Sequence, residues 1–393
     1  MPPNVARHRR TLIFLSSHRR HVKVADRLTG ALAAHWKVEL ICFDRDSANH
    51  PVYSDPNISY RSLGPMRGGV SLSRLLALAR AAQVLWRAAR RIDEVDSVLL
   101  VNTTELLLLA RLCGLTRRPT VLDVTDIHPL QIAGSAAGRA LRWLERKALK
   151  RVNLLVVSSP WFYWDYFIRW LNVTNPALLI ENKTSIACKQ QPSRRTPSNR
   201  IAWNGLLRCQ VSAAVLLECL TLSPDSLQLS LHGGLERLEA YGPKLLIQPN
   251  CTYTGPYEPQ ALPSLLATAS FDWAVDYADR ENSEWLLPNR LYEAIAMGIP
   301  LIAVAGTATG AIVGRADIGI VLAECTAQAV QSALENCRVE IYQRWLRNMD
   351  ALRPRVHRGD EWSRVFAEPG RWGQLKQLPR EVDLSVVLRA ESF

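Results

Sequence analysis

The segment NSEWLLPNRLYEAIAMGIPLIAVA, residues 282–305, contains a helix and a strand whose limits are marked by individual residues. Pro288 suits the first turn of a helix, where a missing N–H costs nothing, and Gly298 suits its end. Pro300 prevents the helix from continuing, and the apolar run 301–305 is typical of a buried strand. The segment therefore predicts a helix between Pro288 and Gly298 that leads directly into a buried strand.

The same alternation of short apolar runs and helical stretches extends along the chain in both directions and is typical of parallel α/β sheets. The expected strands are 11–17, 37–43, 96–102, 120–124, 153–159, 201–205, 227–234, 271–277 and 299–306, with helices such as 71–91, 135–151 and 328–351 between them. The pattern predicts an α/β fold of two tandem Rossmann-like, doubly wound domains that face each other across a cleft.

The length of 393 residues fits two domains, and one stretch is a natural boundary between them. Residues 183–200 are polar, rich in Pro and Ser, and without periodicity, as linkers often are. We therefore expect an N-terminal domain at 1–182, a linker at 183–200 and a C-terminal domain at 201–352. The remaining segment, 353–393, is expected to run back towards the first domain.

The composition is that of a folded globular protein, with 48% hydrophobic and 21% charged residues. The apolar run behind the basic N-terminus, 11–15, is too short for a signal-peptide core, and no stretch approaches the ~20 apolar residues of a membrane span. We therefore expect a cytoplasmic protein. The eight cysteines are scattered without a C-x-x-C pair, which favours reduced thiols over metal sites.

The net charge of +12 is unevenly distributed. Two basic groups stand out: Arg7, Arg9, Arg10, Arg19, Arg20, Lys23 and Arg27 near the N-terminus, and Arg139, Arg142, Arg146, Lys147, Lys150 and Arg151 on one expected helix. Such groups suit nucleic acid, anionic lipid or phosphorylated substrates, although a solvated helix face is the simpler explanation. Because the chain has no nucleic-acid-binding motif, a nucleic-acid partner is not expected.

The helix that begins after Pro288 carries polar residues at the positions where a nucleotide can be bound. Asn289 and Arg290 lie at its positive N-terminal end, which favours a diphosphate, and Glu293 follows one turn later. A carboxylate at that distance can accept hydrogen bonds from both hydroxyls of a ribose. The alternative is an ordinary surface pair between Arg290 and Glu293, which contributes little.

This segment, with GTATGAIVGRADIGIVL at 306–322, resembles the donor-nucleotide region of GT-B glycosyltransferases. The most similar members are the family-four-like enzymes and the bacterial glucuronosyltransferases of exopolysaccharide assembly. The shared pattern is a basic residue, here Arg290, then Glu293 and a G-x-P strand start at 298–300. One departure is that family-four enzymes often have a second glutamate eight residues earlier, where this chain has Trp285.

The resemblance implies that further residues bind the nucleotide sugar. Gly205 and Arg208 lie in WNGLLR, which resembles the glycine-containing loop after the first strand of the donor domain. Gly233 lies in HGG at a strand end, where a base or ribose would pass and a plain turn is the alternative. Thr309 and Gly310 begin a helix that could offer backbone N–H groups to the diphosphate. No metal or other cofactor is expected, because the DRD triplet at 44–46 follows a strand of the other domain.

The stretch VLDVTDIHP, residues 121–129, is a buried strand that continues into a polar loop. We expect Asp123 to stay in the sheet and Asp126 to emerge at its carboxyl end. The resemblance implies that Asp126 is the general base that takes the acceptor's proton, with His128 as an alternative. Capping of the next helix would also explain Asp126, and a loop anchor would explain His128. The resemblance further assigns Ser17, His18 and Arg19 to acceptor binding.

The acceptors of this class imply a membrane partner. They are commonly sugars on a polyprenyl diphosphate at the inner face of the bacterial membrane, so we expect a lipid-linked oligosaccharide acceptor. The helix 135–151 combines Leu141, Trp143 and Leu144 with basic residues and is predicted to lie on the inner-membrane surface. Its apolar stripe also suits packing on the sheet.

An aromatic cluster, PWFYWDYFIRW at 160–170, has seven aromatic side chains in eleven positions. It predicts a helix in which one face is shared by Trp161, Trp164, Ile168 and Leu171. Its other Trp and Tyr side chains suit a membrane interface or the acceptor, and core packing is the alternative.

Together these expectations describe a metal-independent transferase that moves a hexosyl or glucuronosyl group from a nucleotide sugar to a lipid-linked saccharide. The alternative is a sugar-nucleotide epimerase of the same architecture. The sequence leaves open the sugar, the nucleobase, and inversion or retention at the anomeric carbon.

Overall fold

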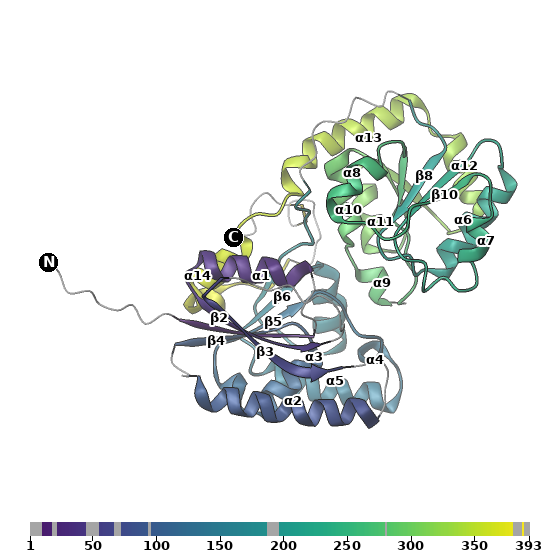
Figure 1. Cartoon of the computed structure of the whole chain (residues 1–393). Coiled ribbons are helices and arrows are strands. Elements are labelled where there is room, and N and C mark those ends of the chain that lie inside the picture. The colour runs from purple at the N-terminus through teal and green to yellow at the C-terminus, as the bar shows by residue number, and fades with distance from the viewer. Residues whose placement is uncertain are drawn as a thin grey trace. The chain divides into compact units, whose positions relative to one another are not determined.

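The computed structural model describes residues 10–17, 22–44, 55–66, 72–92, 96–186, 196–279, 281–379 and 387–388, and the chain folds as two compact units (Figure 1). The first unit contains the described residues up to Ile180, together with Gly359–Leu378. The second contains Glu181–Arg358 and the short turn 387–388. Part of the expected linker, 187–195, lies outside the described residues, whereas Lys183 and Thr184 are buried.

The first unit is built on a seven-stranded parallel sheet with the order β3-β2-β1-β4-β5-β6-β7. Its strands are β1 (Thr11–Ser16), β2 (Lys37–Asp44), β3 (Ile58–Pro65), β4 (Ser97–Val101), β5 (Thr120–Val124), β6 (Leu154–Val157) and β7 (Ala177–Leu179). Its α-helices are α1 (Val22–Ala33), α2 (Leu72–Arg91), α3 (Thr104–Leu112), α4 (Pro129–Ile132), α5 (Ala136–Leu149) and α14 (Glu361–Ala367). Short 3₁₀ turns lie at Leu115–Arg117 and Pro369–Gln374. In Figure 1, α1 and α14 cover one face of the sheet, and α2, α3 and α5 cover the other.

The C-terminal helix α14 completes the core of the first unit. Its Trp362 and Phe366 are buried beside Trp36, whose indole Nε1 donates to the Phe366 backbone oxygen at 2.9 Å. A Cβ on Gly30 of α1 would lie 2.5 Å from the Cβ of Trp362, so this crossing of α1 and α14 requires glycine. Residues far apart in sequence therefore form one core here.

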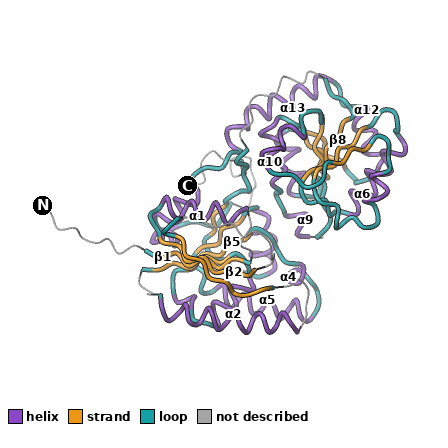
Figure 2. Tube along the Cα trace, in the orientation of Figure 1, coloured by secondary structure: helices purple, strands orange, loops and turns teal. Residues whose placement is uncertain are grey.

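The second unit has a six-stranded parallel sheet with the order β10-β9-β8-β11-β12-β13. Its strands are β8 (Arg200–Asn204), β9 (Gln228–His232), β10 (Cys251–Tyr253), β11 (Phe271–Trp273), β12 (Leu301–Val304) and β13 (Gly319–Leu322). Its α-helices are α6 (Gln210–Leu222), α7 (Gly242–Leu246), α8 (Leu262–Leu265), α9 (Glu281–Trp285), α10 (Asn289–Met297), α11 (Ala308–Ala316), α12 (Ala327–Glu335) and α13 (Val339–Leu352). Short 3₁₀ turns lie at Pro259–Ala261 and Arg353–Arg355. Figure 2 shows the strands inside each unit with helices around them.

Both sheets are doubly wound, which confirms the expected fold class. The order reverses between β1 and β4 in the first sheet and between β8 and β11 in the second. In doubly wound sheets, ligands bind beyond the carboxyl ends of the strands at such a reversal. We therefore expect binding groups among the residues that follow β1, β4, β8 and β11.

The aromatic cluster forms a π-helix, η2 (Phe162–Trp170), instead of the expected α-helix. Hydrogen bonds to the fifth residue widen each turn, so residues four and five apart share a face. The fully buried side chains are Phe162, Tyr163, Tyr166 and Phe167. Of the four residues expected to share one face, Leu171 is buried, whereas Trp161, Trp164 and Ile168 are only partly buried.

Candidate functional site

The strand reversal of the second unit is bridged by Arg290, the second residue of α10. Its Nη2 donates to the backbone oxygen of Asn204 at 2.6 Å, and its Nη1 donates to that of Trp273 at 2.8 Å. Asn204 ends β8 and Trp273 ends β11, so one guanidinium joins the two strands at the reversal. Arg290 is only partly buried, and it lines a pocket at this edge.

Three glycines follow the neighbouring strands β8, β9 and β10. Gly205 donates its backbone N–H to His232, and Gly233 donates to Gly255, each at 2.9 Å. All three glycines have positive φ, with 142° at Gly233. A Cβ on Gly233 would lie 1.9 Å from the Gly205 oxygen, and one on Gly205 would lie 3.6 Å from Arg290 Nη2. The structure thus brings Gly205 and Gly233 close to Arg290, at an edge of the sheet where no side chain covers the backbone of the two glycines.

Buried polar side chains lie beneath this edge. Asn204, His232 and Asp272 are at most 3% exposed. Among the described residues, the Asn204 amide, His232 Nε2 and both Asp272 oxygens have no side-chain hydrogen-bond partner. Burial raises the pKa of Asp272 from 3.8 to about 7, with Arg290 opposing this rise and Glu293 adding to it. Burial also lowers the pKa of His232. Buried donors and acceptors at the carboxyl edge of this sheet are therefore able to form further hydrogen bonds.

Glu293 lies one turn after Arg290 on α10 and is half-buried. Burial raises the pKa of its carboxyl, and Arg290 and Arg358 oppose this rise. The expected helix around it is confirmed, since α10 runs from Asn289 to Met297 and ends at Gly298 with φ of 64°. Asn289 is exposed on the first turn.

The pocket beside Arg290 is lined by the end of β12, the loop after β11, and residues in or next to α9, α10 and α11. The lining residues are Ala274, Val275, Asp276, Ser283, Leu286, Pro288, Arg290, Val304, Thr307 and Thr309. The N-terminus of α11 contributes Thr307, whose hydroxyl caps the helix by accepting the Gly310 N–H at 2.9 Å. The Gly310 N–H is therefore already bonded, and a Cβ on Gly310 would lie 2.0 Å from the Val304 oxygen. The Thr309 hydroxyl donates to the Leu286 oxygen at 3.2 Å.

Arg208 forms ion pairs within the same unit. Its guanidinium lies 3.2 Å from Asp276 Oδ2 and 2.5 Å from Asp279 Oδ2. A phosphate group that approaches Arg208 has to compete with two carboxylates, which the sequence expectation for this residue did not include. Asp276 also lines the pocket, so Arg208 lies at its side.

The strand reversal of the first unit is closed by hydrogen bonds among polar side chains. The Ser17 backbone N–H donates to Asn102 Oδ1 at 3.0 Å, and Asn102 Nδ2 donates to the Ser16 hydroxyl at 2.8 Å. Ser16 ends β1 and Asn102 follows β4, so this contact spans the reversal. The other two expected acceptor residues, His18 and Arg19, lie outside the described residues.

Asp123 and Asp126 lie in different environments near the end of β5. Asp123 is buried in the sheet and accepts two hydrogen bonds from Arg27, at 2.8 and 3.0 Å. Asp126 is exposed, two residues beyond the end of the strand. Because Arg27 is 5% exposed and paired, it does not contribute to a basic surface, contrary to its inclusion in the N-terminal basic group.

His128 caps the four-residue helix α4. Its Nδ1 accepts the Leu130 N–H at 3.2 Å, and its own backbone N–H donates to Gln131 Oε1 at 2.9 Å. The loop-anchor role that was left open for His128 is therefore present. The exposed ring still places its other nitrogen near solvent, in the same loop as Asp126.

The exposed side of α5 combines apolar and basic side chains. Trp143 and Leu144 are 55% and 43% exposed, and the Lys147 ammonium lies 3.7 Å from the centre of the Trp143 ring. Arg146 is also exposed, whereas Leu149 is buried against the unit. The helix thus packs against α3 and α4 and leaves a Trp and a Leu among cations on its exposed side.

In the part of the chain that the structure describes, no helix is long and apolar enough to cross a membrane. Within the same part of the chain, no three His, Cys, Asp or Glu side chains are grouped so as to hold a metal ion.

Sequence reasoning missed Asn102, Asn204 and Asp272. Each is a polar residue inside or directly after an otherwise apolar strand, as in DSVLLVN, IAWNG and FDWAV. That pattern was available as a signal, because a polar group in a buried strand needs a partner. Glu145 gave no such signal, since α5 carries several other charged residues, and Gln131 lies in a four-residue helix too short to show a pattern.

Comparisons with known proteins show which sequences and folds this chain resembles. Residues 21–180 match the family described as "Glycosyl transferase 4-like domain". The chain is 28% identical to the succinoglycan biosynthesis protein ExoL of Rhizobium meliloti (strain 1021) over 354 residues, which cover 85% of this chain and 87% of ExoL.

Solved structures show the same fold at low sequence identity. Sucrose-phosphate synthase from Thermosynechococcus elongatus superposes with a TM-score of 0.67 at 14% identity, covering 93% of this chain and 98% of that one. The Anabaena protein HepE, solved in complex with UDP and glucose, gives the same score and identity over 91% of this chain and 98% of its own. Residues 21–180 therefore match a glycosyl transferase 4-like domain, and the chain has the two-domain fold of these solved structures.

Proposed function

We propose that this glycosyltransferase moves a hexosyl or glucuronosyl group from a UDP-sugar to a saccharide on polyprenyl diphosphate during exopolysaccharide assembly. The observation that carries the proposal is the edge of the second unit, where Arg290, Gly205, Gly233 and Thr309 gather at the strand reversal. The similarity to ExoL, a protein named for succinoglycan biosynthesis, supports the polysaccharide context. HepE, which has the same fold, was solved with UDP and glucose.

In this proposal the second unit binds the donor. Gly205 and Gly233 let the diphosphate approach the backbone, and the N-terminus of α11 near Thr309 faces its negative charge. Glu293 accepts hydrogen bonds from the ribose hydroxyls. The other residues of the proposed donor site are Asn289, Arg290, Arg208 and Gly310. No bound metal is required, because Arg290 and the helix N-terminus supply the positive potential for the leaving diphosphate.

The proposed base is Asp126 on the first unit. Its exposed carboxylate takes the proton of the acceptor hydroxyl while the acceptor oxygen bonds to the anomeric carbon. The bond between that carbon and the diphosphate breaks at the same time, and UDP leaves with its electron pair. Ser17, His18, Arg19 and His128 are the proposed contacts to the acceptor.

We further propose that the enzyme works in the cytoplasm on the inner face of the membrane. Trp143 and Leu144 would enter the lipid interface while Arg146 and Lys147 contact anionic head groups. Lipid-linked acceptors are held at that surface, so binding there raises their local concentration.

A panel of UDP- and GDP-sugars, each incubated with and without a synthetic polyprenyl-diphosphate-linked disaccharide, tests the function. Acceptor-dependent nucleotide release is expected with one UDP-sugar, and Asp126→Asn is expected to abolish it while leaving nucleotide binding intact. Acceptor-independent interconversion of the sugars would indicate an epimerase instead. Wild-type turnover by Asp126→Asn, or a product with retained anomeric configuration, would rule out Asp126 as the base.

A further inference from the structure

A fully buried carboxylate, Glu145 of α5, lies where α3, α4, α5 and η2 meet. It is 0% exposed. Its Oε1 accepts hydrogen bonds from the Thr104 hydroxyl at 2.7 Å and from Gln131 Nε2 at 2.9 Å, and its Oε2 accepts one from the Tyr166 hydroxyl. Burial raises its pKa, while these three donors and Arg142 oppose the rise. Burying a carboxyl group costs free energy, and the three hydrogen bonds that Glu145 accepts offset this cost.

The Gln131 amide connects this carboxylate to the loop that carries Asp126. Its Nε2 end faces Glu145, and its Oε1 end accepts the His128 backbone N–H at 2.9 Å. Gln131 Nε2 also donates to the Thr104 hydroxyl at 3.0 Å and to the Tyr166 hydroxyl at 3.2 Å. These acceptors hold the NH₂ end of the amide at Glu145 and turn its oxygen towards His128. His128 is two residues beyond Asp126, and the orientation of this short segment therefore depends on Glu145.

The same turn of α5 holds the other end of α4. Arg142 Nη1 donates to the backbone oxygens of Gln131 at 2.6 Å and Ala133 at 2.8 Å. A Cβ on Gly138 would lie 2.3 Å from the Ala133 oxygen, so α5 approaches the α4 segment too closely for any side chain there. A four-residue helix such as α4 is not stable alone, and these contacts with α5 stabilise it.

We propose that Glu145 is a positioning residue that acts through Gln131 to hold the segment bearing Asp126 in the geometry needed for proton transfer. The inference rests on the proposed role of Asp126 as base. Displacing a reacting group by about 1 Å can cost ~100-fold in rate, so loss of this contact should appear in kcat more than in donor binding.

Three variants in the full-length protein test the proposal. Glu145→Gln is isosteric but replaces one accepting oxygen with an NH₂ donor, and Tyr166→Phe removes one donor to Glu145. Tyr163→Phe is the matched control, because Tyr163 is equally buried on the same π-helix but its hydroxyl donates to the Asn175 backbone oxygen at 3.1 Å, outside the network. We expect kcat, measured with UDP-glucose and a synthetic polyprenyl-diphosphate-linked disaccharide, to fall about 10–100-fold in Glu145→Gln. It should fall less in Tyr166→Phe and remain unchanged in Tyr163→Phe.

Two readouts separate positioning from general stability. The KM for UDP-glucose should stay at the wild-type value in all three variants. Amide hydrogen exchange of residues 125–133, which needs no substrate, should accelerate in Glu145→Gln and Tyr166→Phe and not in Tyr163→Phe. The double variant of Glu145 and Tyr166 should match Glu145→Gln alone, because both changes remove the same contact.

The outcomes also distinguish this inference from the proposed function. Unchanged exchange of 125–133 in a folded Glu145→Gln, or equal effects of Tyr163→Phe and Tyr166→Phe, would overturn the positioning role. If Glu145→Gln does not fold, the two tyrosine variants decide the question. Wild-type turnover by Asp126→Asn would instead remove the base assignment, and exchange would still show whether Glu145 holds the loop.

Discussion

Arg290 Nη2 lies 2.6 Å from the backbone oxygen of Asn204, 86 residues away in the sequence, at the point where the strand order of the second sheet reverses. The same side chain reaches the Trp273 oxygen at 2.8 Å. A guanidinium has several donors in a planar fork, which suits two carbonyl oxygens on adjacent strands. Arg290 is thus a structural bridge as well as a candidate donor ligand, and both roles can be measured.

Replacing Arg290 with lysine should affect both roles, because a single ammonium cannot reproduce the fork over two strands. We expect the Kd for UDP to rise about 10–100-fold, since charge-assisted hydrogen bonds contribute roughly 1.5–3 kcal/mol each. We also expect a lower Tm. Calorimetric titration with UDP and thermal unfolding measure the two effects. Arg344→Lys is the control, because Arg344 pairs with Asp317 on the exposed surface; an equal change in both variants would contradict a special role for Arg290.

The buried Asp272 should make the stability of the second unit depend on pH. Its pKa is raised by burial from 3.8 to about 7, so the folded state binds the proton more tightly than the unfolded state. The free energy of unfolding gained from this group is fully present below about pH 4. It is lost as pH rises towards 7, by on the order of 4 kcal/mol. The charged groups that act on Asp272 are Arg290 and Glu293.

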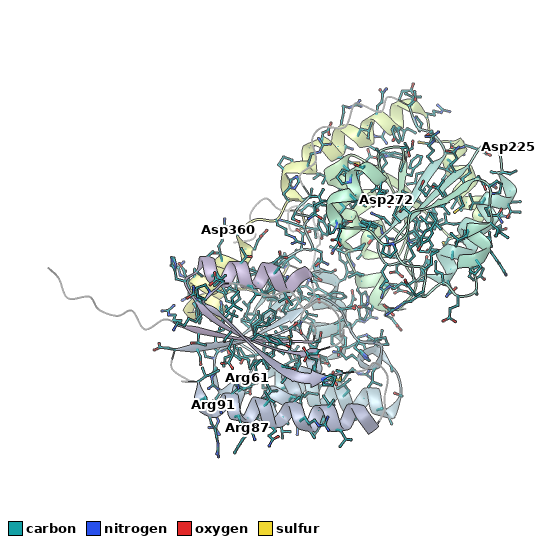
Figure 3. All side chains as sticks on the ribbon, in the orientation of Figure 1. Arg61, Arg87, Arg91, Asp225, Asp272 and Asp360 are labelled. Atoms are coloured by element: carbon teal, nitrogen blue, oxygen red, sulfur yellow. The ribbon has the colours of Figure 1, made fainter. Side chains whose placement is uncertain are left out.

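Asp272→Asn removes this titration. Its Tm relative to the wild type should therefore rise between pH 5 and pH 8.5, as followed by thermal unfolding in a series of buffers. Asp225→Asn is the control, because Asp225 is exposed at the rim of the same unit, as Figure 3 shows, whereas Asp272 lies inside it. A pH-independent difference between Asp272→Asn and the wild type would contradict the prediction.

Gly233→Ala should destabilise the edge of the second sheet. The new Cβ would lie 1.9 Å from the Gly205 oxygen, and φ at this position is 142°. Strained backbone of this kind costs about 1–3 kcal/mol, and the clash adds to it. Denaturant unfolding measures the change, and UDP binding should weaken with it. Gly314→Ala is the opposite control: it lies in α11 with only an ordinary contact at 3.5 Å, so it should be neutral or slightly stabilising.

The exposed side of α5 should determine binding to anionic lipid. Trp143→Ser combined with Leu144→Ser should weaken sedimentation with phosphatidylglycerol vesicles about tenfold or more, because a buried Trp and Leu together contribute several kcal/mol at an interface. Ile247→Ser, at a residue that is 79% exposed in the second unit, is the control for a lost surface hydrophobe. Wild-type protein that fails to bind these vesicles at low salt would contradict the membrane proposal.

Much of the fold was predictable from local residues, and the strands that escaped prediction share one feature. The helix between Pro288 and Gly298 appears as expected, and so do the inner strands of both sheets. Inner strands of a parallel sheet are buried on both faces, so their sequences are continuous apolar runs. The four unexpected strands, β3, β7, β10 and β13, are the four edge strands. An edge strand has one neighbour and an open side, so its sequence can be short or polar, as in ISYRSLGP at 58–65.

Local sequence also identified the residues that carry candidate chemistry, because polar groups after buried strands emerge at one edge of a parallel sheet. Only the tertiary structure decided the partners of those groups: two carbonyl oxygens for Arg290, two carboxylates for Arg208, and a helix cap for His128. Arg290 and Arg208 have partners 17 to 86 residues away, on strands and loops brought together by the strand order. A repeating apolar pattern specifies that a segment is a strand, but its neighbours follow from how all the strands pack into one sheet, and this determines which charges meet.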